Sequence, residues 1–386
     1  MTAWLAGMAA LICAGGVIYQ WLGALVAERW LAEAGATSTE TLPPVTLLRP
    51  LKTAVPDLHA KLDQLARALQ PGDQLVLGAA HGSDELAQAM ALQWAHPERD
   101  IVVVPCGEGA AANPKISKLV QMDGECRHGR LILSDSEAVI DAAWLTTLRR
   151  EWLEHDCAVL TTPYRFVGAK TWPQRLDAAA ALLALWPGLA VRRRWGRVDF
   201  TLGACTALRR HDLTEVGGWA AFGDFLAEDR ELGAALAARG ATIRLAATVT
   251  TLDCDALGWR DGWRHQCRVA TTYRAATTAG FAGMLLTHSS TAAVALALLP
   301  VPAAWRPWCV GWALSAVALR WLAARRLARV AGFPVPGLFA CGLVAGWVET
   351  AAWWRSWFSG WVWWSGRWWW IERGGKLRKN LTKASG

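Results

Sequence analysis

The sequence predicts a mixed α/β domain with a mainly parallel sheet, flanked by helices that are apolar enough to cross a membrane. Two observations support this prediction. Short β-rich runs alternate with helical segments through the middle of the chain, and long uncharged segments lie at both ends. Such alternation is typical of βαβ units, because parallel strands need a crossover connection. The 386 residues suffice for one large domain or two ordinary ones.

The first long uncharged segment covers residues 3–27. A helix needs about 20 apolar residues to cross a hydrocarbon core of ~30 Å, so this segment is long enough. A signal peptide is the alternative, but no basic region precedes the segment, and it is long for a signal-peptide core. We therefore interpret residues 1–30 as a transmembrane anchor.

Residues 40–280 are predicted to form the α/β domain. The strand candidates are "PVTLLRPL", "DQLVLGAA", "RDIVVVPC" and "RLILSDSE", and the segments "PDLHAKLDQLARALQ" and "SDELAQAMALQWAH" show helical spacing of apolar residues. Ligands of parallel sheets bind outside the carboxyl ends of the strands. The acids after the fourth run and the "AAH" after the second are therefore expected at the ligand-binding edge.

The C-terminal third is again apolar, and we predict transmembrane helices over residues 281–356. Residues 280–305, 307–319 and 330–348 carry no charge. The first and third are long enough to span a membrane, whereas the second spans it only if Arg320 snorkels to an interface.

Basic residues predict the orientation. They flank the apolar segments and recur in the tail "KLRKNLTK", and Arg29, Arg49 and Lys52 begin the middle domain. Because basic loops stay inside, we expect an integral membrane protein of the bacterial inner membrane with its α/β domain in the cytoplasm.

The Trp-rich segment has a composition of its own. Half of residues 353–370 are tryptophan. Tryptophan concentrates at the membrane–water interface, and a packed aromatic core is the alternative. We predict that residues 357–386 form an interfacial segment followed by a basic tail.

Charge and cysteine content exclude other classes. The formal net charge is +8, but much of the excess flanks apolar segments and no nucleic-acid motif accompanies it, so no nucleic-acid partner is predicted. The nine cysteines form no C-x-x-C pair and no zinc spacing, which indicates reduced structural thiols.

The segment "GRLILSDSEAV" (129–139) ends a buried strand with Asp135, Ser136 and Glu137. Carboxylates there cost desolvation energy unless a positive group meets them. Asp and Glu suit a hard divalent cation, which could also carry a diphosphate, so Asp135 and Glu137 are candidate metal ligands. A helix N-cap by Ser134 or Asp135 is the alternative.

Two further groups of residues carry chemistry. Glu228 and Asp229 begin a helical pattern, where the helix dipole or a general base at a cleft explains a carboxylate. In "WRHQCRVATTYR" (263–274), Arg268 lies three residues after His265 and could reach a phosphate. A juxtamembrane basic patch is the alternative for this segment.

The order of these motifs resembles the membrane-bound family-2-type glycosyltransferases near ceramide glucosyltransferase and the hopanoid-biosynthesis-associated glycosyltransferase. The similarity runs from the N-terminal anchor to about Leu298. It rests on "LLRPLK" (47–52), "NPKISKL" (113–119), "LSDSE" (133–137), "LGACTALRR" (202–210), "FLAEDRELG" (225–233) and "HQCRV" (265–269).

The resemblance implies a GT-A (Rossmann-like) fold, a UDP-sugar donor and a divalent metal, Mg²⁺ or Mn²⁺. It implies that Asp135 helps to hold nucleotide and metal, that Asp229 is the general base, and that Arg268 attends the departing diphosphate. The residues expected to bind the donor or its diphosphate are Lys52, His81, Asp84, Asn113, Lys115, Asp135, His265 and Arg268.

The sequence departs from the family pattern at three positions. His81 stands where the family usually has Asp, Glu137 stands in its D-x-D or D-S-G motif, and Val269 replaces the Trp after the motif Arg.

We expect an inverting transfer of a sugar to the hydroxyl of a membrane lipid, either a hopanoid polyol or a ceramide-like acceptor. The lipid bilayer is the implied partner. A processive polysaccharide synthase would share these motifs but would need more spans. A catalytically inactive relative acting as a membrane scaffold or partner subunit is the alternative from another class.

Overall fold

The computed structural model describes residues 2–33, 42–109, 111–255, 258–334 and 337–379. It divides into a sheet domain, Leu31–Phe166 with Gly196–Asp255, and a helical unit, Met1–Trp30, Val167–Trp195 and Ala256–Gly386. The predicted α/β domain therefore includes two segments that belong to the helical unit. Its predicted start at residue 40 and the end of the predicted basic tail, 380–386, lie outside the described residues.

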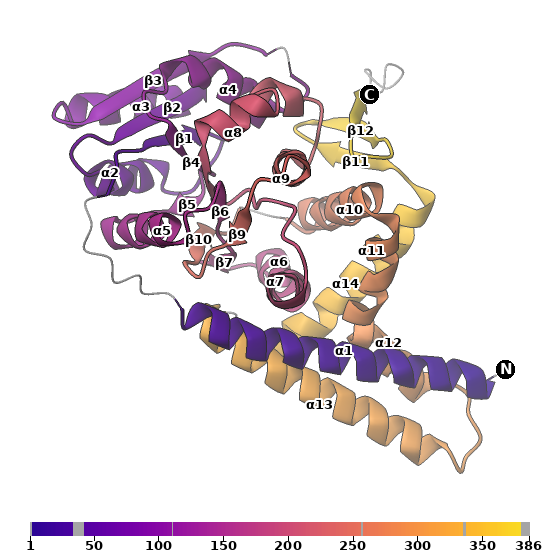
Figure 1. Ribbon diagram of the computed structural model, residues 1–386. Coiled ribbons are helices and arrows are strands. Elements are labelled where there is room, and N and C mark those ends of the chain that lie inside the picture. Colours follow the sequence, from indigo (N-terminus) through magenta and orange to yellow (C-terminus); the bar gives the residue numbers. More distant parts are fainter. Residues whose placement is uncertain (1, 34–41, 110, 256–257, 335–336, 380–386) are drawn as a thin grey trace. The chain divides into compact units, whose positions relative to one another are not determined.

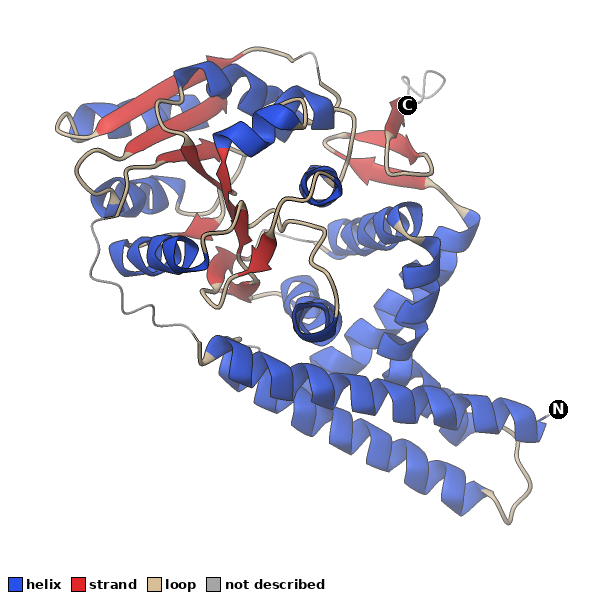
Figure 2. Ribbon diagram, in the orientation of Figure 1, coloured by secondary structure: helices blue, strands red, loops and turns tan. Residues whose placement is uncertain are grey.

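A seven-stranded sheet organises the sheet domain (Figures 1 and 2). Its order is β3-β2-β1-β4-β8-β6-β9. The strands are β1 Thr46–Pro50, β2 Gln74–Ala80, β3 Asp100–Cys106, β4 Arg130–Ser134, β6 Val159–Thr161, β8 Cys205–Arg209 and β9 Ile243–Leu245. Strands β1 to β4 are parallel to their neighbours in that group, whereas β8 is antiparallel to β4 and β6. The four predicted strands and the mixed α/β class are confirmed.

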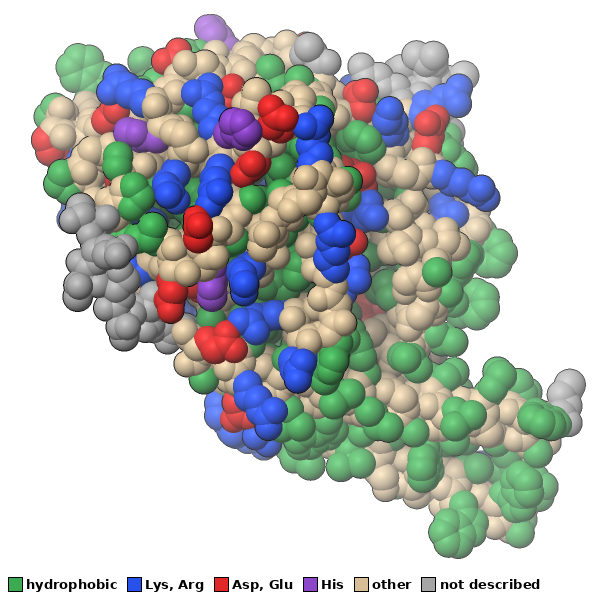
Figure 3. Space-filling model, in the orientation of Figure 1, with side chains coloured by type: hydrophobic (Ala, Val, Ile, Leu, Met, Phe, Trp, Pro, Cys, Tyr) green, Lys and Arg blue, Asp and Glu red, His purple; other side chains and the backbone are tan. Residues whose placement is uncertain are grey.

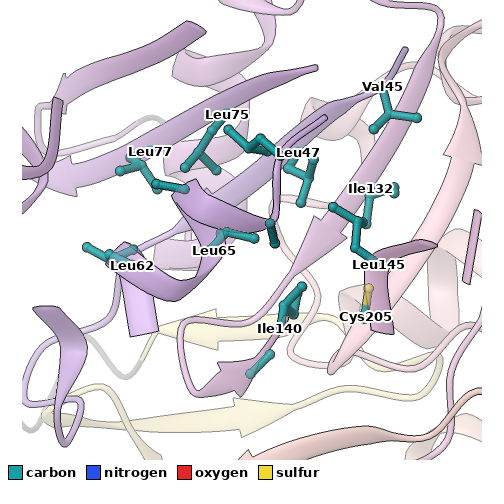
Figure 4. Packing of buried hydrophobic residues seen from close by; sticks show 14 of the residues in the cluster. Val45, Leu47, Leu62, Leu65, Leu75, Leu77, Ile132, Ile140, Leu145 and Cys205 are labelled. Carbon is teal, nitrogen blue, oxygen red and sulfur yellow. The ribbon is translucent and has the colours of Figure 1, made fainter. Parts of the chain in front are cut away.

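Helices cover both faces of this sheet, because alternate strand residues point to opposite faces. Leu47 belongs to the core shared with α2 Leu58–Ala68, α3 Asp84–Ala95 and α5 Ala142–His155, part of which Figure 4 shows. The next residue, Leu48, belongs to the core shared with α4 Pro114–Met122, α8 Arg210–Glu215 and α9 Glu228–Ala238. Burial on both faces explains why the parallel strands are continuous apolar runs.

The strand register brings several loops to one edge of the sheet. Ser134, the last residue of β4, pairs with Cys205, the first residue of β8. Residues 135–137 therefore leave β4 at the edge where residues 202–204 enter β8. A small second sheet pairs β5 Ala138–Val139 with β10 Thr250–Asp253, which brings the end of β10 to the same loop.

The helical unit contains the helices at both ends of the chain and two helices from its middle. They are α1 Thr2–Leu31, α6 Trp172–Ala180, α7 Trp186–Trp195, α10 Trp259–Ala276, α11 Thr278–Gly283, α12 Ser289–Leu298, α13 Arg306–Ala331 and α14 Leu338–Phe358. Among the described residues, Thr2–Leu31 and Thr278–Leu298 are long and apolar enough to cross a membrane.

Helices α1 and α13 run side by side in the same direction. Trp312 Nε1 donates to the Ala10 carbonyl at 3.2 Å, and Arg326 Nη2 lies 2.6 Å from Glu28 Oε2. Away from a charged cluster at one end, hydrophobic side chains are the prevailing coloured type along this pair (Figure 3). The number of spans in the C-terminal third stays a prediction.

The Trp-rich segment begins in the last turns of α14 and continues into a three-stranded antiparallel sheet of β11 Trp361–Trp364, β12 Arg367–Ile371 and β13 Leu377–Lys379. Opposed tryptophans pair edge to face, with ring centroids 5.3 Å apart for Trp361–Trp370 and 5.5 Å for Trp363–Trp368. Trp369 is buried on the other face. The tryptophans of β11 and β12 therefore pack against one another. The predicted position of this segment at a membrane interface stays a prediction.

Candidate active site

A lysine and two acids meet at the carboxyl edge of β4. Lys115 Nζ lies 2.7 Å from Asp135 Oδ1 and 3.0 Å from Glu228 Oε1. Asp135 follows β4, Lys115 is in the first turn of α4, and Glu228 is the first residue of α9. The strand-end acid thus meets a protein cation. The helix after this loop begins at Ala142 with Asp141 as its N-cap, so neither Ser134 nor Asp135 has the capping role.

Asn113 holds two of these elements together. It is fully buried, and its side-chain oxygen accepts from the backbone N–H groups of Lys115 at 2.9 Å and Ile116 at 3.3 Å, which makes it the N-cap of α4. Its Nδ2 donates to the Phe225 carbonyl at 2.9 Å and to Glu228 Oε2 at 3.0 Å. Asn113 therefore positions Lys115 and Glu228.

Asp229 and Asp135 converge on Gly203. A Cβ added to Gly203 would lie 3.3 Å from Asp229 Oδ2, 3.5 Å from Asp135 Oδ2 and 3.7 Å from Lys115 Nζ. The other oxygen of each carboxylate already has a partner. Lys115 pairs with Asp135 Oδ1, and the Arg230 backbone N–H donates to Asp229 Oδ1 at 2.8 Å. Gly203 leaves room between two carboxylates and one ammonium group.

The charges of this group are unbalanced, because three carboxylates share one lysine. Burial and the neighbouring Glu228 raise the pKa of Asp229 to about 7, and Lys115 offsets only part of this effect. Burial also raises the pKa of Asp135. Burial opposes the charge of Lys115, but Asp135 and Glu228 outweigh it and hold the pKa of Lys115 well above its usual range. Asp229 is thus poised to exchange a proton near neutral pH.

A second lysine meets the other acid of the strand-end tripeptide. Lys52 Nζ lies 2.7 Å from Glu137 Oε1 and 2.8 Å from Asp255 Oδ2. Burial alone would raise the pKa of Glu137, but the ion pair with Lys52 outweighs burial and the net shift is downward. Glu137 therefore stays ionised.

A third cation, Arg49, contacts the end of β4, just before the loop of residues 135–137. Arg49 of β1 is fully buried, and its Nε donates to Ser134 Oγ at 3.0 Å. Burial lowers the pKa of Arg49 to about 10 against the opposing effects of Cys205, Glu137 and Asp135. Arg49 is still charged at neutral pH, so the buried strand end has a cation beneath it as well as lysines beside it.

His81 and Asp84 lie at the carboxyl end of β2. His81 follows the strand, and its backbone N–H donates to the Cys106 carbonyl at 2.9 Å. Asp84 is in the first turn of α3 behind the Ser83 N-cap, where the helix dipole favours a carboxylate. They share the predicted edge with Asp135, and their contact with a donor stays a prediction.

The motif residues of α10 form a hydrogen-bonded chain within the helical unit. Arg268 Nη2 lies 2.7 Å from His265 Nδ1, and His265 Nε2 lies 3.3 Å from Asp177 Oδ1. Arginine only donates, so Nδ1 is the acceptor and the proton of a neutral His265 is on Nε2, facing Asp177. Asp177 thus orients His265, which in turn positions Arg268.

The site residues fit a divalent cation only if a ligand brings further donors. The described residues contain no group of three or more His, Cys, Asp and Glu side chains that could hold a metal ion. Asp135 and Glu137 offer two carboxylates, and Mg²⁺ is commonly held by one or two carboxylates together with substrate phosphates. A small cavity of about 10 Å³, lined by Lys115, Gly203 and Asp229 among others, has room for one water molecule.

Sequence reasoning missed several residues of this arrangement. Arg49, a base inside the apolar run of β1, was used only for the orientation, and Glu228 was noted beside Asp229 but not expected to pair with Lys115. Asp177 and Asp255 gave no signal, because their partners are distant in sequence. All nine cysteines are free thiols, as predicted.

The mainly parallel sheet with one antiparallel strand, and with acids and lysines at its carboxyl edge, is the GT-A-like fold of solved glycosyltransferases. The solved mannosyltransferase PcManGT of Pyrobaculum calidifontis, in complex with GDP-Man and Mn²⁺, has a similar fold. The TM-score is 0.54 and the sequence identity 18%, over 92% of this chain and 99% of that one.

The chain belongs to glycosyl transferase family 21, whose model matches residues 8–377. It is 23% identical to ceramide glucosyltransferase 1 of Caenorhabditis elegans over 208 residues. This match covers 52% of the chain and 43% of the nematode protein. The resemblance stated from the motifs is confirmed.

Proposed function

We propose that the protein transfers a sugar from a UDP-sugar to the hydroxyl of a membrane lipid, with inversion at the anomeric carbon. The observation that carries this proposal is the convergence of Asp135 Oδ2, Asp229 Oδ2 and Lys115 Nζ on Gly203. It puts a carboxylate of near-neutral pKa beside a cation and a second carboxylate that suits a metal–diphosphate complex.

Asp229 acts as the general base. The acceptor oxygen attacks the anomeric carbon from the face opposite UDP, its proton goes to Asp229, and the bond to the diphosphate oxygen breaks with its electron pair. A base is most effective when its pKa lies near the working pH, and the pKa of Asp229 is about 7. Its Oδ1 accepts the Arg230 N–H, which leaves Oδ2 for the acceptor hydroxyl.

Asp135 and Glu137 would hold a divalent cation, Mg²⁺ or Mn²⁺, together with the donor diphosphate. When bound, this cation supplies positive charge to the leaving group. Lys115 holds Asp135 from one side, and Lys52 holds Glu137 ionised from the other. His81 and Asp84 meet the nucleoside, and Arg268, positioned by His265, meets the departing diphosphate.

The acceptor is a lipid with a free hydroxyl, of the ceramide or hopanoid type. Two apolar segments long enough to cross a membrane support a lipid acceptor and a membrane location. The nematode relative is named for ceramide, which favours the ceramide type. We infer that the sheet domain faces the cytoplasm, because basic residues follow the anchor.

The test is UDP release by the purified full-length protein in mild detergent. UDP-glucose and UDP-N-acetylglucosamine would be supplied with and without Mn²⁺, with ceramide or a mixed bacterial lipid extract as acceptor. We expect lipid-stimulated, metal-dependent release. Asp229→Asn should lower its kcat/KM by about 10³-fold, because general-base catalysis contributes about 10² to 10⁴.

Glu231→Gln is the matched control, because it removes a carboxylate from the same turn of α9 outside the group that meets Gly203. It should retain activity within about twofold. Donor binding without any turnover in wild type would overturn the proposal in favour of the inactive scaffold, which His81 and Val269 suggest.

A further inference from the structure

The helical unit contains a cavity of about 240 Å³ between α10 and the C-terminal sheet. Arg260, Trp263, Arg264 and Cys267 recur at helical spacing, so one face of α10 forms one wall. Trp361, Trp363 and Trp368 form the opposite wall, and Arg355 from the last turn of α14 closes one side. The cavity is far larger than the one-water cavity beside Gly203, and it is large enough for a small headgroup.

The cavity is strongly cationic. Three of its lining residues are arginines, and none of the described residues that line it is acidic. Among the described residues, Asp261 forms an ion pair with one of these arginines, 3.7 Å from Arg264. The Asp261 side chain is 58% exposed, so solvent screens its charge. A group of arginines without matching carboxylates favours an anionic ligand.

Two of the guanidinium groups are held in place. The Arg264 guanidinium lies 4.4 Å from the centroid of the Trp363 ring, a cation–π contact. Arg355 Nη2 donates to the Trp361 carbonyl at 3.0 Å, while its Nη1 is buried with no hydrogen-bond partner within the described chain. A buried donor without a partner costs free energy, and a ligand oxygen would satisfy it.

Large aromatic side chains are exposed in the cavity lining and at the end of α14, the helix that supplies Arg355. Trp263 is 39% exposed, Trp368 is 37% exposed, and at the end of α14 Trp354 and Phe358 are 55% and 83% exposed. Exposed tryptophans beside basic residues are typical of the membrane–water interface. The same helical unit contains both apolar segments that could cross a membrane.

We propose that this cavity binds the phosphate of an anionic phospholipid headgroup, with Arg260, Arg264 and Arg355 contacting the phosphate and the tryptophan walls contacting the glycerol and upper acyl chains. The exposed aromatic rim is the reason to prefer a lipid over a water-soluble phosphate, which would gain nothing from it. This site shares α10 but no residue with the site proposed for sugar transfer, and its test does not depend on turnover.

The test uses the full-length protein in a neutral detergent. It would be titrated by microscale thermophoresis with short-chain phosphatidylglycerol, short-chain phosphatidylcholine and inorganic phosphate. We expect phosphatidylglycerol to bind with a Kd at least tenfold lower than phosphatidylcholine, whose choline cation the arginines repel. Inorganic phosphate should bind at least tenfold more weakly than phosphatidylglycerol, because it lacks apolar contacts.

The variant Arg260→Gln/Arg264→Gln should raise the Kd for phosphatidylglycerol at least tenfold. Arg325→Gln/Arg329→Gln removes the same charge from α13, outside the cavity, and should change it less than twofold. Equal binding by the cavity variant and wild type would overturn the site. Inorganic phosphate binding as tightly as phosphatidylglycerol would overturn the lipid assignment. If the double variant does not fold, Arg260→Gln alone, at an exposed position, should still raise the Kd about threefold.

Discussion

The two acids of the strand-end tripeptide, Asp135 and Glu137, lie one residue apart but in opposite electrostatic surroundings. Asp135 shares Lys115 with Glu228 and the nearby Asp229, and burial raises its pKa. Glu137 has Lys52, shared with Asp255, and its pKa is lowered. Lys115 is 20% exposed and Lys52 is 53% exposed, so the first group is the drier one.

This difference shows how one loop can hold carboxylates with different tasks. Where titratable groups are pushed apart in pKa, one is suited to exchange protons and another to stay charged. The Lys115 group has one cation for three carboxylates, so Asp229 binds a proton near neutral pH and reduces the excess negative charge. The Lys52 group is nearer to balance and is open to water, so it behaves as an ordinary ion pair.

The largest expected difference between the two groups is in catalysis by variants of the two acids. Asp135→Asn should lower kcat/KM for UDP-sugar transfer about 10²-fold, because it removes a metal-facing charge at the crowded end of the loop. Glu137→Gln should lower it about tenfold, since Asp135 remains. The measurement is initial rate against Mn²⁺ concentration for both variants. Equal losses would remove the distinction between the two groups.

The next effect concerns stability without ligands. Because burial and Glu228 raise the pKa of Asp229 to about 7, its ionised form disfavours the folded state. Asp229→Asn should therefore stabilise the free protein by about 2 kcal/mol at pH 8. This is less than the full pKa shift corresponds to, because the Asp229 side chain is only partly buried and solvent screens its charge.

The sign of this effect fixes its pH dependence. Between the unfolded pKa near 3.8 and the folded pKa near 7, the folded state holds a proton that the unfolded state has lost, so wild-type stability falls as pH rises. The advantage of Asp229→Asn should grow from pH 4 to 7 and then stay constant, as chemical denaturation would show. If Asp229→Asn is no more stable than wild type at pH 8, ionisation of Asp229 does not destabilise the folded state.

A third expectation sharpens the role of Lys115. Asp229 must be ionised to accept a proton, so kcat/KM should fall as pH drops below about 7. Lys115 lowers the pKa of Asp229, and Lys115→Met should move this acidic limb upward by about one pH unit. Lys118→Met, one turn along α4, is the control and should leave the limb in place. If the acidic limb of the kcat/KM profile does not move in Lys115→Met, a group other than Asp229 acts as the base.

The smallest effect is expected at Lys52. Because its side chain is half exposed, its ion pair with Glu137 is screened, and Lys52→Met should change the donor KM by no more than about threefold. Steady-state kinetics at saturating acceptor would measure this. A hundredfold rise would instead show that Lys52 contacts the diphosphate directly.

Much of the fold was predictable from local patterns. Apolar runs and three- or four-residue spacing located β1 to β4 and helices α2 and α3, because parallel strands buried on both faces are apolar throughout. The predicted base falls in the first turn of α9, and His265 and Arg268 lie within hydrogen-bonding distance on α10, while the contact of Arg268 with a phosphate stays a prediction. The division into a sheet domain and a helical unit was not predictable, since residues 167–195 separate from their neighbours in sequence.

The sequence by itself determined the class of protein, the buried strands and the acids at their carboxyl edge, because these depend on residue type and on spacing along one segment. Only the tertiary structure decided which cation meets which acid. Lys115 reaches Asp135 and Glu228, Lys52 reaches Glu137 and Asp255, and Gly203 enters between Asp135 and Asp229. These contacts join segments up to about 200 residues apart, and pKa values depend on distance and burial rather than on order in the chain.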